Sequence, residues 1–218
     1  MKSPRRQADR RAATVTALLD ATIDSLVEVG YAGTTTRSVA ERAGVSQGAQ
    51  QHYFRTKTEL VDAAMIRLVE QLVADANAQP IDADNEAERA AALLDRLWEI
   101  HNLPITPAVF ELFNVARTDP EIATQVKAAL SRGMDAIRTI AHALLPTFAA
   151  RPDFDDTLDI IVATVRGTVI IAAIPGADTL HSPWPNLKEH LLAQVLGRPT
   201  PGDAARAARE PGGSGPDW

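Results

Sequence analysis

The sequence predicts an all-α protein, with a small helix-turn-helix domain near the N-terminus and a larger helical domain after it. Apolar residues recur at helical spacing over most of the chain, and no segment shows the alternating pattern of a strand. Glycine and proline lie between these segments, for example at Gly44 and Pro175-Gly176, where they end helices. Residues 34–60 hold two very short helical segments before a longer one. Together these observations favour helices throughout.

The first helix is expected over residues 11–29. Its apolar residues recur on one face, which would cover the two short helices that follow; they are Val15, Leu18, Leu19, Thr22 and Leu26. Gly30 would end this helix, and Tyr31 would pack beneath it. Residues 1–10 are basic and polar, and we expect a disordered arm there. The alternative is an arm that follows DNA phosphates or enters a minor groove.

Residues 35–54 are expected to form the helix-turn-helix. Thr35 or Thr36 can cap the first short helix, because a hydroxyl accepts a hydrogen bond from an otherwise unpaired backbone N–H. Gly44 would adopt the left-handed conformation that closes this helix, and Ser46 would cap the second. In such a motif the second helix enters the major groove of DNA.

The outer face of the second short helix favours DNA binding. Ser46, Gln47, Gln51 and His52 all offer hydrogen-bonding groups, and no acidic residue lies among them. An ordinary solvated helix would include Asp or Glu, which phosphates repel. The residues alone therefore predict a helix that lies against DNA.

Residues 11–72 resemble the DNA-binding domain of the tetracycline-repressor (TetR) family. The resemblance lies in motifs at fixed spacing, namely Gly30-Tyr31, Thr34-Thr35-Thr36, Ala40, Ala43-Gly44-Val45-Ser46, Gly48-Ala49, His52-Tyr53-Phe54 and Lys57-x-x-Leu60. It implies a homodimeric, ligand-responsive transcriptional regulator, usually a repressor. The expected base-edge or close-approach residues are Thr36, Arg37, Gln47, Gly48 and Gln51. The residues expected to contact phosphates are Thr35, Ser46, His52, Tyr53 and Lys57.

One pair departs from the family pattern. Gln50-Gln51 stands where the family usually has Leu-Tyr, whose Leu packs inward and whose Tyr contacts a phosphate. Gln50 is therefore expected either to bury an amide or to face the DNA from a slightly different helix position. A buried amide without partners would lower stability.

The charge distribution agrees with a DNA-binding head. The chain of 218 residues has a net charge of −6, but residues 1–57 hold nine Lys or Arg against five Asp or Glu. A positive head on a negative body orients the head towards phosphates. There is no cysteine, no secretory signal and no comfortable membrane span, so we expect a soluble cytoplasmic protein.

A fourth helix should begin at Thr56, because Thr56-x-x-Glu59 matches a capping box. Lys57 would then lie in its first turn, where a cation opposes the helix dipole and a phosphate would resolve the conflict. Residues 79–85 read as a linker. A ligand-binding and dimerisation domain is expected over 80–197, with helices near 86–101, 107–117, 120–145, 155–174 and 185–196. Residues 198–218 would form a disordered tail.

The body domain carries candidate pocket and interface residues. The pocket candidates combine apolar bulk with a few polar groups, as small-molecule sites do; they are Trp98, His101, Phe110, Phe113, Asn114, Met134, Arg138 and Arg166. Such residues are more often plain core. Arg166 could pair with a carboxylate of its own chain, of a second copy or of a ligand, and we expect the internal pair. The last two long helices are apolar on more than one face and would suit a dimer interface.

Asp155-Asp156-x-x-Asp159 raises the alternative of an all-α diphosphate-processing enzyme, since such aspartates hold magnesium in prenyl-diphosphate enzymes. No second aspartate motif accompanies it, and acidic residues favour a helix N-terminus in any case. The five histidines form no metal-ligand pair, and no catalytic motif is present, so neither a metal nor a cofactor is expected.

The sequence therefore predicts a DNA-binding regulator rather than an enzyme. We expect a homodimer that binds a palindromic operator, with half-sites about one helical turn or a multiple apart, and that a small molecule releases. An activator of the same fold remains the alternative.

Overall fold

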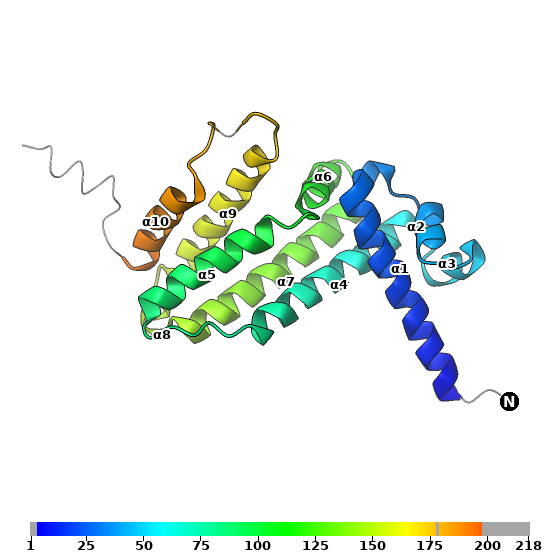
Figure 1. Ribbon diagram of the computed structural model, residues 1–218, viewed down its shortest axis with the longest axis horizontal. Helices are drawn as coiled ribbons and strands as arrows, with labels where there is room; N and C mark the ends of the chain where they lie inside the picture. Colours follow the sequence, from blue (N-terminus) through cyan, green and yellow to red (C-terminus); the bar gives the residue numbers. More distant parts are fainter. Residues whose placement is uncertain (1–3, 178, 198–218) are drawn as a thin grey trace, which may run out of the picture. The chain divides into compact units, whose positions relative to one another are not determined.

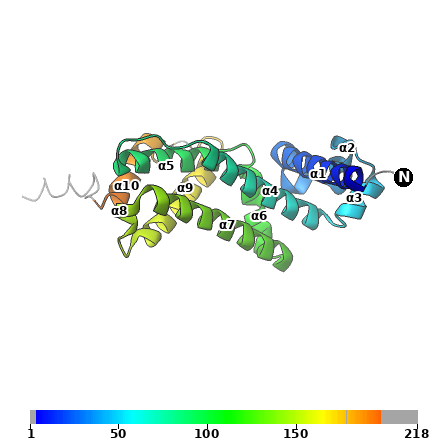
Figure 2. The same ribbon diagram turned by 90° about the horizontal axis from the view of Figure 1, so that it is seen from below.

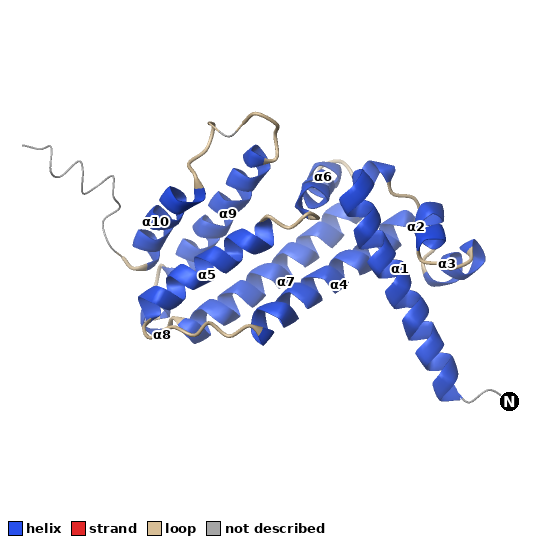
Figure 3. Ribbon diagram, in the orientation of Figure 1, coloured by secondary structure: helices blue, strands red, loops and turns tan. Residues whose placement is uncertain are grey.

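The computed structural model describes residues 4–177 and 179–197, and every regular element among them is a helix (Figures 1 and 3). The chain divides into two compact units. The head unit, up to Pro80 and from Asn102 to Ala136, contains α1 (Pro4–Gly33), α2 (Thr36–Arg42), α3 (Gln47–Tyr53), α4 (Lys57–Ala78), α6 (Thr106–Ala116) and the first part of α7 (Pro120–Leu144). The body unit, from Ile81 to His101 and from Ile137 onwards, contains α5 (Glu86–His101), the rest of α7, α8 (Pro146–Ala149), α9 (Phe154–Ala172) and α10 (Trp184–Val195).

Residues 102–136, predicted from the sequence to lie in the ligand-binding and dimerisation domain, belong to the same compact unit as the helix-turn-helix. Their apolar residues share a core with α1 and α4, where Leu26, Val61, Ala108, Leu112 and Ile122 are all buried. Burial of this apolar surface stabilises the arrangement by roughly 25 cal/mol per Å². Helical periodicity marks these residues as buried but does not say which helix they pack against.

A second core holds the helix-turn-helix on α1 and α4. Leu18, Val39, Leu60 and Ala64 are completely buried together, and Tyr53 packs against them. The apolar stripe predicted for the first helix is confirmed, because Leu18, Leu19, Thr22 and Leu26 are buried. Figure 2 shows α2 and α3 close to α1 in a second view of the head unit.

Helix α1 is described from Pro4, so residues 4–10 are helical, and residues 1–3 of the expected arm lie outside the described residues. Proline suits the first position of a helix, where its missing N–H has no partner in any case, and Arg, Gln and Ala then continue the helix well. The regular helix is interrupted at Gly30, whose φ of 69° is left-handed. The tail predicted over 198–218 lies outside the described residues.

The predicted caps are present, with one difference. Thr35 caps α2 in a capping box with Ser38, and Ser46 caps α3 by accepting from the Ala49 N–H. Thr56 caps α4 by accepting from the Glu59 N–H at 3.0 Å. The Glu59 carboxylate, however, accepts from the Arg55 N–H at 2.6 Å. The second hydrogen bond of the predicted capping box therefore goes to the residue before the cap and not to the cap itself.

The helices of the body unit lie within two residues of their predicted ranges, and α8 is an additional short turn that starts at Pro146. Helices α5, α9 and α10 pack on one another. Phe154, Leu158, Ile161, Val165 and Val169 form the buried side of α9. In the part of the chain that the structure describes, none of the helices combines the length and apolar character that a bilayer span requires.

Gln50 faces the core and not the outer side of α3. It is fully buried, and its Nε2 donates to the Phe54 carbonyl oxygen at 2.8 Å. Its Oε1 is buried without a hydrogen-bond partner. The amide is thus half-satisfied, and an unpaired buried acceptor costs about 1–3 kcal/mol.

We predict that Gln50→Leu raises the free energy of unfolding by about 1 kcal/mol, because it removes the unpaired oxygen at the expense of one hydrogen bond. Chemical denaturation measures the change. Gln51→Leu is the matched control: Gln51 is exposed, so its substitution should alter stability by less than about 0.5 kcal/mol. A lower stability of Gln50→Leu would show that the bond to Phe54 outweighs the unpaired oxygen.

Candidate functional site

Helix α3 presents a polar face to solvent. Gln47, Gly48, Gln51 and His52 are exposed, whereas Gln50 is buried behind them. A glycine inside a helix costs about 1 kcal/mol relative to alanine. Apart from its chain neighbours and the nearby backbone of α3, no described atom lies within 4 Å of where a Cβ of Gly48 would be, so packing does not require glycine there. A molecule that lies against the outer face of α3 could therefore come close to the helix backbone at Gly48.

Helix α2 places its two base-edge candidates differently. Arg37 is exposed and pairs with Glu41 one turn later, its Nε lying 3.0 Å from Oε1. An exposed ion pair contributes little free energy, so the guanidinium can exchange Glu41 for another anion. Thr36 is half-buried and has less surface to offer.

Two of the residues predicted to contact phosphates are occupied with capping. The Thr35 hydroxyl accepts from the Ser38 N–H at 3.1 Å, and the Ser46 hydroxyl accepts from the Ala49 N–H at 3.3 Å. Both residues are exposed. Their first role is to begin the two helices, which fixes the position of the polar face of α3.

His52 and Tyr53 end α3, and their rings meet edge to face with centroids 5.3 Å apart. Tyr53 is half-buried against the head core. The guanidinium of Arg11, on α1, lies 5.9 Å from the centre of the Tyr53 ring. No signal in the sequence singles out Arg11, because it is distant from Tyr53 along the chain and only packing places it beside α3.

Lys57 is half-buried, and its ammonium is tied to the Tyr31 carbonyl, which its position in the sequence does not indicate. Its Nζ donates to the Tyr31 carbonyl oxygen at 2.5 Å and lies 4.0 Å from the centre of the Tyr31 ring. Burial lowers the pKa of the Lys57 ammonium, and the Glu111 carboxylate opposes part of that shift. Glu111 itself accepts from the Tyr31 N–H at 2.6 Å. The Tyr31 carbonyl oxygen thus takes one of the three ammonium donors at the start of α4.

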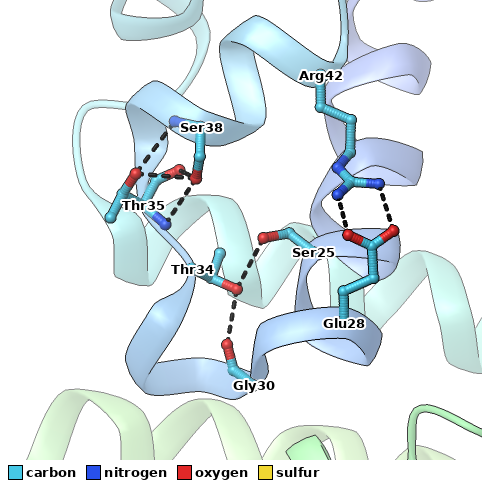
Figure 4. Close-up of polar contacts among 7 residues, drawn as sticks. All are labelled: Ser25, Glu28, Gly30, Thr34, Thr35, Ser38 and Arg42. Carbon is cyan, nitrogen blue, oxygen red and sulfur yellow. Dashed lines mark hydrogen bonds and ion pairs between the residues drawn. The ribbon is translucent and has the colours of Figure 1, made fainter.

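A polar network holds α2 on α1 (Figure 4). Arg42 makes a two-pronged ion pair with Glu28, and this pairing lowers the pKa of the Glu28 carboxyl. The buried Thr34 hydroxyl bonds to Ser25 at 3.1 Å and donates to the Gly30 carbonyl oxygen at 2.8 Å. These contacts fix the direction in which the chain leaves the Gly30 bend and enters the helix-turn-helix.

The residues predicted for a pocket are divided between the two units. Phe110, Phe113, Asn114 and Met134 belong to the head unit, and the Phe110 and Phe113 rings are 5.8 Å apart. The head unit also has a hollow of about 340 Å³ between α1, α4 and residues 103–105, and none of the predicted residues lines it.

In the body unit, Trp98, His101, Arg138 and Arg166 have well-defined partners. Trp98 stacks on Trp184, with ring centres 4.6 Å apart and an angle of 10° between the rings. Arg138 pairs with Asp159 at 2.7 Å. Arg166 donates from Nε to Nε2 of His101 at 3.3 Å, so the internal carboxylate partner expected for Arg166 is not what the structure shows.

Two of the three aspartates that suggested a diphosphate enzyme face Arg138 and His142 of α7. Asp159 pairs with Arg138, and Asp155 lies 2.8 Å from Nε2 of His142. Each helix contributes residues four apart, so the two pairs form a short antiparallel ladder. Among the described residues, no group of three or more His, Cys, Asp or Glu is placed to hold a metal ion.

Comparison with known proteins identifies a shared domain and a shared fold. The family model described as bacterial regulatory proteins, tetR family, matches residues 18–64. The HTH-type transcriptional regulator CymR of Pseudomonas putida is 30% identical over 171 residues, which are 77% of this chain and 84% of CymR.

Two solved structures align over most of the chain. A transcriptional regulator from Rhodococcus sp. Rha1 superposes with a TM-score of 0.60 and 28% identity, over 84% of this chain and 94% of that one. The regulator FadR of Bacillus subtilis, solved with stearoyl-CoA, superposes with a TM-score of 0.58 and 16% identity, over 83% of this chain and 97% of that one.

The half-buried His101 predicts how stability depends on pH. Burial lowers the pKa of His101 below its usual value of about 6.5, the Leu97 carbonyl opposes that shift, and the charge of Arg166 adds to it. Between the folded and the unfolded pKa the unfolded chain binds more protons, so the free energy of unfolding falls as the pH drops from about 6.5.

We therefore expect His101→Asn to flatten the decline in stability between about pH 7 and pH 5, by up to about 1.4 kcal/mol per pH unit. Denaturant titrations over that range measure it. His190→Asn is the matched control, because His190 also bonds through Nδ1 to the carbonyl oxygen four residues earlier, at 2.9 Å, but is exposed. Equal pH profiles for His101→Asn and the wild type would contradict this account.

Proposed function

This chain belongs to the tetR family of bacterial regulatory proteins, and from that premise we propose that it is a repressor. It binds a palindromic operator as a homodimer, and a small molecule releases it. The observation that carries the DNA-binding part is the exposed face of α3, where two amides, an imidazole and a glycine stand together without an acid. Two copies related by a two-fold axis would present two such faces to half-sites about one helical turn or a multiple apart.

The residues proposed to meet DNA divide into two kinds. Gln47, Gln51 and Arg37 carry side chains that read base edges, and Thr36 and Gly48 allow close approach. Thr35, Ser46, His52, Tyr53 and Lys57 fix the position on phosphates. Lys57 stays in this set because an ammonium has three donors, of which Tyr31 uses one.

The dimer forms through α9 and α10 in this proposal. One stripe of α9 and of the residues just after it is apolar and faces outward, and its members recur three and four apart; they are the exposed Ile160, Ala163, Ile170 and Ile174 and the half-buried Gly167. Ile160, Ile170 and Ile174 are 56%, 42% and 55% exposed, and a continuous apolar stripe marks an interaction surface where one exposed isoleucine would not. A second copy would cover this stripe, and the small residues at its centre would let two helices approach closely.

A small-molecule effector is supported by the fold that this chain shares with FadR, whose structure contains stearoyl-CoA. The head unit contains both α4, which starts beside the helix-turn-helix, and α6, whose Glu111 holds Tyr31. An effector that moves either helix would change the spacing of the two recognition helices. Ligand and operator would then oppose each other, with a coupling of about 1–3 kcal/mol.

The first test separates base reading from phosphate binding. Selection from random duplex DNA should return a two-fold symmetric site. On that site, Gln47→Ala should cost about 1–3 kcal/mol per half-site and relax the preference at one base position. Lys57→Ala should weaken binding to all sequences alike. It should also reduce the slope of log binding constant against log salt concentration by roughly one unit for each phosphate that the protein no longer neutralises.

Binding titrations at several salt concentrations, on the selected site and on single-base variants of it, measure both effects. A uniform decrease in affinity across all sequences for Gln47→Ala would remove Gln47 from the base-reading set. An asymmetric site bound by a monomer would overturn the proposed operator geometry.

The second test concerns the dimer. Ile170→Glu should raise the dimer dissociation constant at least about tenfold, because two-fold symmetry places two unpaired charges in one apolar interface. Analytical ultracentrifugation measures the constant. Val29→Glu is the control, since Val29 is a 54% exposed aliphatic residue of the head unit. Equal dissociation constants for Ile170→Glu and the wild type would place the interface elsewhere.

A further inference from the structure

We propose that Arg166, positioned by His101, anchors a carboxylate group of the effector. The inference deepens the proposed function and rests on it, because it names the chemical class of the small molecule. Arg166 lies on α9 and His101 ends α5, and both belong to the body unit.

The hydrogen bonds fix the charge of this pair. Nδ1 of His101 lies 2.8 Å from the Leu97 carbonyl oxygen, which can only accept, so Nδ1 carries the proton. Nε2 then has a free lone pair, and it accepts from the Arg166 Nε–H at 3.3 Å. His101 is therefore neutral, and the pair together carries a single positive charge.

No acid balances this charge inside the described chain. Arg37, Arg42, Arg67, Arg138 and Arg151 each pair with a carboxylate, but no described carboxylate lies within 4.0 Å of the Arg166 guanidinium. Arg166 is nevertheless half-buried. A partly desolvated cation without a counter-ion lowers stability, and a bound anion would remove that penalty.

The residues around Arg166 and His101 indicate which chemical group is attached to the carboxylate. Val162, Val165 and Val169, which flank Arg166 on α9, are buried. One turn before His101, Trp98 stacks on Trp184. Asp95, also on α5, already accepts from Trp184 and Lys188 of α10, at 3.0 and 2.5 Å. Arg166 thus lies on an apolar helix, and its partner His101 lies one turn from an aromatic pair, which fits a carboxylate attached to an apolar body.

A carboxylate fits better than a phosphate. The planar guanidinium matches the two oxygens of a carboxylate, and a monoanion neutralises a single positive charge. A phosphate dianion would leave one negative charge in a half-buried site that offers one cation and a neutral imidazole. The charge of the pair therefore selects a monocarboxylate.

The test compares acids with their neutral amides on the DNA-free protein, by calorimetric titration. The probes are octanoate with octanamide, and 3-phenylpropanoate with 3-phenylpropanamide. At least one acid should bind tenfold or more tightly than its amide. Arg166→Met should abolish that preference, whereas Arg132→Met, which removes an exposed arginine of α7, should leave it unchanged.

Ligand-free measurements on the same variants complete the test. Arg166→Met should melt at a higher temperature than the wild type, because it removes an unbalanced charge, and its dimer dissociation constant should be unchanged. A lower melting temperature or a weakened dimer would indicate that Arg166 pairs with a carboxylate of a second copy. Either result would overturn the proposal.

The proposal is also overturned if neither acid is preferred over its amide, or if the preference survives in Arg166→Met. Operator binding is measured without any effector. A failure of this inference is therefore distinguishable from a failure of the proposed DNA binding.

Discussion

The head unit depends on how the chain is held at the bend between Gly30 and Tyr31. Gly30 has a φ of 69°, which residues with a side chain rarely adopt. The Tyr31 N–H donates to Glu111 of α6, and the Tyr31 carbonyl accepts from Lys57 at the start of α4. Three helices that are distant in sequence therefore meet at one residue. The direction of α2 and α3, and hence of the exposed face of α3, follows from this bend.

The two proposed binding sites use opposite electrostatic designs. On α3 the two glutamine amides are uncharged and exposed, so they can exchange water for base edges at little cost and discriminate by hydrogen-bond geometry. At Arg166 a charge is partly withdrawn from water and left without a counter-ion. Such a site gains most from a ligand that supplies the missing charge. The first arrangement suits reading a sequence, and the second suits responding to one small anion.

The head could be predicted more fully than the body. Capping hydroxyls at Thr35, Ser46 and Thr56 and the left-handed Gly44 depend on neighbouring residues alone, and all are found as predicted. Helix ranges in the body were also predictable, because helical periodicity is local. The partners of Lys57, Arg138 and Arg166 were not, since each lies far from its partner along the chain. Spacing within one helix carries no information about such distant partners.

By itself the sequence therefore determined the all-α class, the helix-turn-helix and the polar face that α3 turns outward. Tertiary structure alone decided that Gln50 is buried, that residues 102–136 join the head unit, and that Arg166 meets a neutral histidine. The reason is physical. Helix propensity, capping and periodicity act over a few residues, whereas desolvation and ion pairing depend on which surfaces the folded chain brings together.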